Sequence, residues 1–344
     1  MLRPLVLTLV TFAACAGTAP EPTPGPDLAE MTLPGSIPEN QKGDVYKLLL
    51  ELDQAIDSYQ ATLDSQGSQR RDSQLEKIER YLRDTVLDTG ARQLGQGLAQ
   101  DAGWQPGRNF HRLTAIAADQ SSAWQQGIAL AALGFSGKEE AMPTILQGAQ
   151  LANVALVDRA VFGLAVLRAP KTPPGVVAAV VTRPEFPEDS RVAAAWALCQ
   201  LQTTTDRLEE YAPLWLAMTE QRDRLPAGVQ LYAVRGLGLL RDLRHADVVA
   251  PFLQHPMPLV RCAATIALAR MNAQAHWRAI LALLEPQETN QNVRLHASKA
   301  LQALAGGVDH GYDVGAWLKQ FDRGTPATAG STEPAERAGS PQSR

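Results

Sequence analysis

Residues 260–271 read VRCAATIALARM, and residues 293–304 read VRLHASKALQAL. Both segments fit the pattern V-R-x-x-A-x-x-A-L-x-x-L, with Met in place of the final Leu in the first segment. Apolar or small residues spaced by three and four positions form one stripe along an α-helix. Small residues at the fourth and seventh places, counted from the arginine, let neighbouring helices approach closely. The pattern therefore predicts a helix that packs tightly against other helices.

The same spacing recurs along the middle of the chain. With the arginine position as the marker, six copies begin at residues 123, 157, 191, 230, 261 and 294. Each copy is followed by a turn and a second apolar stretch, so each repeat is expected to be a helical hairpin. Such a hairpin cannot bury its apolar face alone and must stack on copies of itself. We therefore predict an all-α fold in which residues 119–322 form a right-handed α-solenoid.

This repeat resembles the HEAT-like repeat family in its short bacterial form, which bilin lyases share. There a helix of the form D-x-x-V-R-x-x-A-x-x-A-L-x-x-L precedes a shorter second helix. The resemblance covers about residues 119–306 and implies the fold, but the family includes scaffolds, receptors and a few enzymes. It also implies a structural place for Arg191, Arg261 and Arg294, paired with acidic or backbone groups of a neighbouring repeat.

Two apolar stripes precede the repeats and predict a helical hairpin within an N-terminal helical cap at residues 44–118. They consist of Val45, Leu49, Leu52, Ile56, Tyr59 and Leu63, and of Leu75, Ile78, Leu82 and Val86. A partner-binding coiled coil is the alternative. At the other end of the stack, we expect Trp317 to be an apolar plug for the last repeat rather than a ligand aromatic.

The first residues have the order of a bacterial export signal. Arg3 precedes an apolar run of about ten residues, which is too short to span a bilayer. The run ends in FAAC, which resembles the bacterial lipobox and implies a signal peptide at residues 1–15 with acylation of Cys15. Cleavage without a lipid is the alternative. By the sorting rule of lipoproteins, Ala16 favours the outer membrane, so we expect an envelope lipoprotein facing the periplasm.

The two ends of the chain are poor in large apolar residues. A Pro-rich segment at residues 16–43 is expected to be a disordered tether, and residues 323–344 a disordered tail. The formal net charge of −4 provides no basic field, so no nucleic-acid partner is expected.

The sequence has no spacing typical of a catalytic or metal site. Its six histidines never occur as H-x-x-x-H or H-E-x-x-H, so no helix presents two metal ligands on one face. We therefore expect no cofactor and no metal, and we predict that the chain is not an enzyme. An exported enzyme with a site assembled between repeats, metal-dependent or lyase-like, is the alternative. Cys199 and Cys262 belong to separate repeats and are expected to be packed thiols without a disulfide.

The resemblance implies that the second helices line a concave working surface. Ten polar residues on these helices are our candidate contacts for a protein or peptide partner: Glu139, Glu140, Gln147, Glu209, Glu210, His245, Asp247, Gln254, His276 and Arg278. A merely solvated face is the alternative for each of them. The predicted function is a non-enzymatic protein-binding scaffold of the bacterial cell envelope, with a purely structural envelope component as a further possibility.

Overall fold

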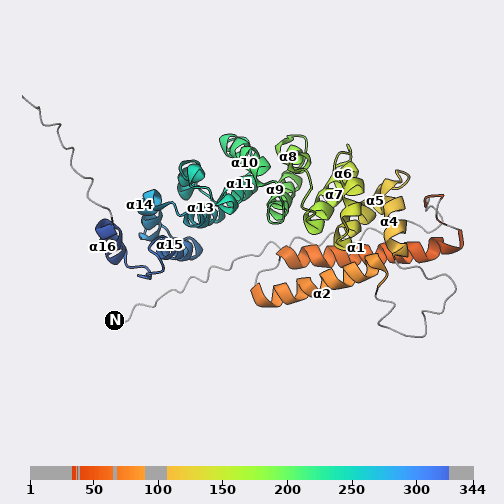
Figure 1. Cartoon of the computed structure of the whole chain (residues 1–344), viewed down its shortest axis with the longest axis horizontal. Coiled ribbons are helices and arrows are strands. Elements are labelled where there is room, and N and C mark those ends of the chain that lie inside the picture. The colour runs from red at the N-terminus through yellow and green to blue at the C-terminus, as the bar shows by residue number, and fades with distance from the viewer. Residues whose placement is uncertain (1–32, 36, 38, 65–67, 90–106, 325–344) are drawn as a thin grey trace, which may run out of the picture.

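The structure is a computed structural model that describes residues 33–35, 37, 39–64, 68–89 and 107–324. Throughout these ranges the regular secondary structure is helical, and helical hairpins stack into one curved row (Figure 1). The predicted all-α solenoid of stacked helical hairpins is thereby confirmed. The predicted signal peptide with Cys15, and most of the predicted tether and tail, lie outside the described residues.

Each copy of the sequence pattern forms the first helix of a hairpin. These first helices are α5 (Ala123–Leu133), α7 (Val154–Leu167), α9 (Glu188–Gln202), α11 (Ala227–Leu240), α13 (Pro258–Arg270) and α15 (Gln291–Leu304). The side chains of Asn153 and Asn290 accept hydrogen bonds from backbone N–H groups of the first turns of α7 and α15, which fixes where these helices begin. The alanine at the fourth place of the pattern is fully buried from α7 to α15, as the spacing requires.

The second helices are shorter and are partly 3₁₀. They are α6 (Met142–Gly148), α8 (Pro174–Thr182), α10 (Tyr211–Glu220), α12 (Ala246–Val249) with η8 (Ala250–Gln254), α14 (Trp277–Leu281) with η10 (Ala282–Leu284), and α16 (Val314–Gly324). Trp317 of α16 is fully buried, and its indole N–H donates to the Gly311 carbonyl at 3.0 Å. The predicted plug of the last repeat is therefore confirmed.

Small residues bring neighbouring first helices close together. A Cβ atom at Gly163 of α7 would lie 2.5 Å from the carbonyl oxygen of Leu130 in α5, and one at Gly238 of α11 would lie 2.7 Å from Cα of Ala267 in α13. Contacts between neighbouring first helices are dense, whereas contacts between neighbouring second helices are sparse. The stack therefore bends toward the first helices, which form the inner edge of the arch in Figure 1. The expectation that second helices line the concave face is wrong for this reason.

The two N-terminal stripes form the hairpin α1 (Lys42–Asp64) and α2 (Ser68–Leu87), preceded by η2 (Glu39–Gln41). The hairpin runs lengthwise beneath the first helices (Figure 1) and, with α4 (Arg108–Ala118), packs against the first repeats. Leu33 and Ile37 are also buried, so packed structure begins before residue 43, earlier than the predicted end of the tether. The cap thus covers part of the concave face as well as the end of the row.

The repeated arginines and the two cysteines have the structural places predicted for them. Arg191 donates to the Val181 carbonyl of the preceding repeat at 2.9 Å, and Arg261 donates to both oxygens of Glu288 at 2.7 and 2.9 Å. The Arg294 guanidinium lies 5.4 Å from the centre of the Tyr312 ring. Cys199 and Cys262 are buried and free.

Of the helices in the described ranges, none is both long and apolar enough to span a membrane.

Candidate functional site

The inner groove is the face of the row formed by the outward side chains of the first helices. The α1–α2 hairpin fills its N-terminal half, which we call the closed half, against α4, α5 and α7 (Figure 1). The remaining part, along α9, α11, α13 and α15, is the open half. The division of the groove into these halves is a tertiary feature that the repeat pattern does not contain.

Aromatic contacts hold the hairpin in the closed half. The Tyr59 ring of α1 meets Phe135 edge-on at 5.2 Å and Phe162 at 6.1 Å between ring centres. Nearer the start of α1, Tyr46 lies 6.1 Å from Trp124 of α5. Edge-to-face pairs of this kind add specific geometry to the burial of apolar area. The hairpin is thus docked by packing along much of its length.

One arginine supplies the charged part of this docking. Arg159 of α7 donates to Asp53 of α1 at 3.1 Å and to Asp57, one turn later, at 3.4 Å. Burial raises the pKa of Asp53, and the attraction to Arg159 offsets that rise only in part. The closed half therefore accepts a helix that combines an apolar stripe with carboxylates beside it.

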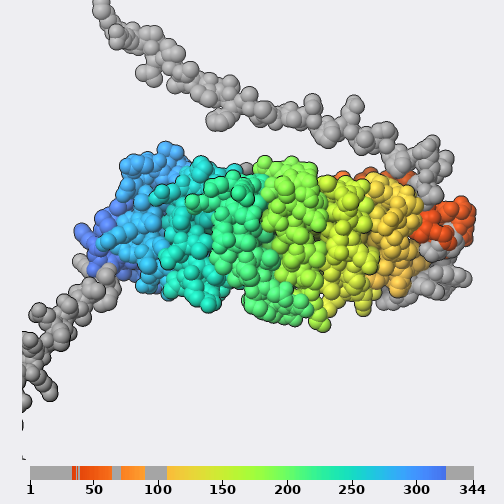
Figure 2. Space-filling model, turned by 90° about the horizontal axis from the view of Figure 1, so that it is seen from above, coloured from red at the N-terminus to blue at the C-terminus, as the bar shows by residue number. Residues whose placement is uncertain are grey.

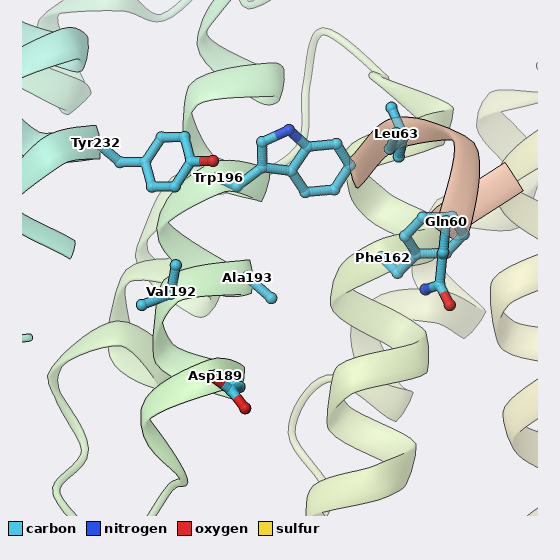
Figure 3. Close-up of a pocket in the computed structure, with 8 residues that line it drawn as sticks. All are labelled: Gln60, Leu63, Phe162, Asp189, Val192, Ala193, Trp196 and Tyr232. Atoms are coloured by element: carbon cyan, nitrogen blue, oxygen red, sulfur yellow. The ribbon is translucent and has the colours of Figure 1, made fainter. Parts of the chain in front are cut away.

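A hollow of about 490 Å³ opens where the tip of α1 meets α9, at the boundary between the two halves (Figure 3). It is lined by Gln60, Leu63, Phe162, Asp189, Val192, Ala193, Trp196 and Tyr232. The Trp196 indole stacks on Phe162 with 18° between the ring planes and 6.3 Å between their centres. These rings and the carboxylate of Asp189 suit an apolar or aromatic side chain with a polar end.

Asp158 lies at the edge of this region. Its carboxylate accepts a hydrogen bond from the Ser190 hydroxyl at 2.8 Å. Burial raises the pKa of Asp158, and the bond from Ser190 lowers it by less. The bond joins α7 to α9 and gives Asp158 a structural role beside the hollow.

The second hollow, of about 300 Å³, lies in the open half between α11 and α13. Its lining residues are Leu231, Arg235, Leu259, Cys262, Ala263, Ile266, Ala267 and Arg270. Leu259 is 59% exposed, and Leu295 on the neighbouring helix α15 is 39% exposed. Leu259 therefore leaves part of the apolar lining of this hollow open to solvent.

Two arginines, Arg235 and Arg270, line this second hollow, and the charge of Arg241 acts on Arg270; the three are called the arginine cluster. Burial lowers the pKa of Arg270, and the nearby charges of Arg235 and Arg241 lower it further. Across the described ranges, no carboxylate forms an ion pair with any of the three. The cluster is therefore a concentration of positive charge that the fold itself leaves uncompensated.

The ten residues predicted as partner contacts do not line the inner groove. They belong to the second-helix segments, which are the second helices together with the short 3₁₀ turns that directly precede them, on the outer edge of the arch. Figure 2 looks onto that edge and shows successive repeats as side-by-side bands. Several form local pairs there, including His276 with Asp247 at 3.0 Å and Arg278 with Asp322 at 3.1 Å. The residues whose expected concave placement is corrected are Glu139, Glu140, Gln147, Glu209, Glu210, His245, Asp247, Gln254, His276 and Arg278.

The sequence reasoning missed the outward residues of the first helices. In α13, for example, Leu259, Cys262 and Ile266 are apolar positions that do not belong to the repeat stripe. A helix that is apolar on more than one side is covered on more than one side. That second apolar face was the available indication of a groove on the first helices.

Metal-ligating side chains are not gathered in this region. In the part of the chain that the structure describes, no group of three or more His, Cys, Asp or Glu residues could hold a metal ion.

Comparisons with known proteins concern the fold. No protein-family model matches the chain, and no curated protein matches it. Among solved structures, it is similar to the complex of CpcE and CpcF of phycocyanin lyase from Nostoc sp. PCC7120. The identity is 17% over 79% of this chain and 94% of that chain, with a TM-score of 0.36. At this level of identity the likeness carries no activity from one protein to the other.

This comparison corrects one expectation from the sequence. We predicted that the chain is not an enzyme, but the structure it resembles belongs to a lyase. That prediction is withdrawn.

Proposed function

We propose that this chain binds a protein partner in the open half of the inner groove. The main observation in support of this proposal is that apolar side chains on the first helices are accessible. Leu259 and Leu295 are the most exposed of them. Shape supports the proposal, because the first helices of a curved solenoid present an extended surface suited to a partner. A buried apolar centre with a charged margin is the usual composition of a protein interface.

The test is site-specific photo-cross-linking in the native cell envelope. A photo-reactive residue replaces Leu259 in the full chain, and the control replaces Leu243, which is 57% exposed but lies in a second-helix segment. We expect a partner adduct of defined mass from position 259 and none from position 243. The substitution Leu295→Glu should remove the adduct, whereas Leu243→Glu should leave it. Equal labelling from both positions, or none from position 259, contradicts the proposal.

The proposed place of action is the bacterial cell envelope. The apolar run and the FAAC sequence at the start of the chain support export and acylation of Cys15. Several acyl chains would supply the two or more hydrophobic signals that stable anchoring requires. The substitution Cys15→Ser should abolish labelling by radioactive palmitate and release the protein from membranes. Membrane retention of this variant would remove the lipid anchor from the proposal.

A further inference from the structure

The closed half of the groove already contains an example of the ligand that this surface accepts. Helix α1 buries Leu52, Ile56 and Tyr59 and points Asp53 at Arg159 of the first-helix row. Its sequence includes five acidic residues and two lysines, so it is an acidic amphipathic helix. The same row of first helices continues into the open half, where nothing in the described ranges fills the groove.

The open half offers the corresponding features to a second helix. Leu231, Leu259 and Ile266 line the hollow between α11 and α13. They provide the apolar contact surface that aromatic side chains provide in the closed half. Arg235 and Arg270 stand at the same hollow, as Arg159 stands beside α1. Each of the two is exposed, and clustering of like charges makes a counter-charge favourable there.

We propose that the open half takes an amphipathic helix of a partner protein, and that carboxylates on this helix pair with the arginine cluster. This inference rests on the proposed function and adds the chemistry of the partner. Apolar side chains of the helix enter the hollow beside Leu259, while the carboxylates lie one turn apart, as Asp53 and Asp57 do on α1. Helix-in-groove recognition of this type depends on anchors spaced by three and four residues.

The first experiment uses a synthetic peptide with the sequence of residues 42–64 as the probe and the full chain as the receptor. A neutral peptide, in which Asn and Gln replace the acidic residues, is the matched control. We expect the acidic peptide to cross-link to a photo-reactive residue at position 259 and to bind less tightly as salt is raised. We expect the neutral peptide to bind roughly tenfold to a hundredfold more weakly. Equal binding of the two peptides overturns the inference.

Paired substitutions locate the charge dependence. Arg235→Gln with Arg270→Gln should weaken the acidic peptide by a similar factor and leave the neutral peptide unchanged. The control pair, Arg183→Gln with Arg222→Gln, removes two exposed arginines outside the hollow and should leave both affinities unchanged. A single-stranded DNA oligomer that binds more tightly than the acidic peptide, with the same arginine dependence, would assign the cluster to another class of ligand and overturn the inference.

The cellular cross-link separates this inference from the proposed function. If Leu295→Glu removes the adduct at position 259 and the Arg235 and Arg270 pair of substitutions does not, the groove binds a protein but not through carboxylates. If position 259 gives no cellular adduct while the peptide results hold, the site for an acidic helix exists, but the proposed binding of a partner in the cell is contradicted. If the adduct contains a second copy of this chain, the groove mediates self-association, and the inference of a separate partner protein is overturned.

Discussion

Arg159 and Asp53 are 106 positions apart in the sequence, and they meet at 3.1 Å where the N-terminal hairpin crosses the second repeat. Both side chains are largely buried, with 28% of Arg159 and 22% of Asp53 exposed. This contact is the charged link between the hairpin and the repeats. Together with the aromatic contacts of Tyr59, it holds the hairpin in the closed half of the inner groove.

The hairpin is expected to respond unequally to loss of these two partners. Arg159→Ala leaves both Asp53 and Asp57 without their cation, and we expect it to destabilise docking of α1 by about 1–2 kcal/mol. Asp53→Asn should cost less than about 1 kcal/mol, because burial raises the pKa of Asp53 and the charged form is the costly one. Amide hydrogen exchange along α1 is the measurement. Equal acceleration by the two variants contradicts this assignment.

The same pKa shift gives a pH dependence. Since the folded-state pKa of Asp53 is raised, its protonated form is favoured in the docked state, so this group favours docking more as pH falls through that pKa. The difference in α1 exchange between the natural chain and Asp53→Asn should therefore shrink at acidic pH. A difference that persists or grows on acidification would show that the titration of Asp53 does not cause it.

The close approach of α5 and α7 is expected to depend on Gly163. A Cβ there would lie 2.5 Å from the Leu130 carbonyl oxygen, a backbone atom that can move only with its helix. We expect Gly163→Ala to cost about 1–3 kcal/mol through overpacking and to reduce curvature at the second repeat. Denaturant unfolding and small-angle scattering measure the two effects.

Gly175→Ala is the matched control, because a Cβ at this position in α8 has no neighbour within 4 Å. It should be neutral or stabilising by up to about 1 kcal/mol, since alanine is a better helix former and restricts the unfolded chain. If both alanine variants behave alike, the close approach of the first helices does not set the curvature.

The clamp between Arg261 and Glu288 should contribute to stability above acidic pH. Burial raises the pKa of Glu288, but bonds from Arg261 and from the Asn290 N–H outweigh it and hold the pKa below its usual value of 4.5. We expect Glu288→Gln to cost about 2–4 kcal/mol at neutral pH, because Arg261 loses its buried counter-charge. Glu285→Gln, at an exposed position nearby, should change stability by less than about 0.5 kcal/mol.

A lowered folded-state pKa also fixes the direction of the pH effect. The contribution of Glu288 is present above pH 4.5 and is lost as pH falls through the folded-state pKa. The unfolding free energies of the natural chain and of Glu288→Gln, measured with denaturant, should therefore converge as pH falls through that lowered folded-state pKa. If the two unfolding free energies converged at alkaline pH instead, the pH dependence would belong to a group other than Glu288.

The cysteines are expected to differ in reactivity. Burial raises the pKa of Cys199 to about 12, so at pH 8 only about one thiol in ten thousand is the reactive thiolate. Burial also raises the pKa of Cys262, but this side chain lines the second hollow and retains 7% exposure. Quantitative mass spectrometry after iodoacetamide treatment should find Cys262 alkylated first. Faster labelling of Cys199 would mean that α9 opens more readily than the groove.

The repeat register and the helical hairpins could be predicted because they depend on local patterns. The stripe around Ala264 and Ala267 requires a helix with close neighbours, and a hairpin with one apolar face requires stacking. The structural roles of Arg261 and Trp317 followed from their place in the register. The amphipathic hairpin at α1 and α2 was also visible as two stripes.

The candidate site could not be predicted in the same way. The ten polar residues of the second helices were chosen for a concave face, and the row bends in the other direction. Leu259 and Ile266 lie on the same helix as the repeat stripe but outside the stripe, so the repeat register gave them no role. Arg235 and Arg270 come from different repeats, and only stacking brings them to one hollow.

The sequence by itself determined the elements, their order and their stacking, since a period of apolar and small residues specifies helices that must pair. The tertiary structure alone decided the sense of curvature, because that depends on how closely Gly163 and Gly238 let successive first helices approach. It also decided where the hairpin lies, through contacts such as Arg159 with Asp53. Both outcomes depend on distances between residues far apart in the chain, which no local pattern encodes.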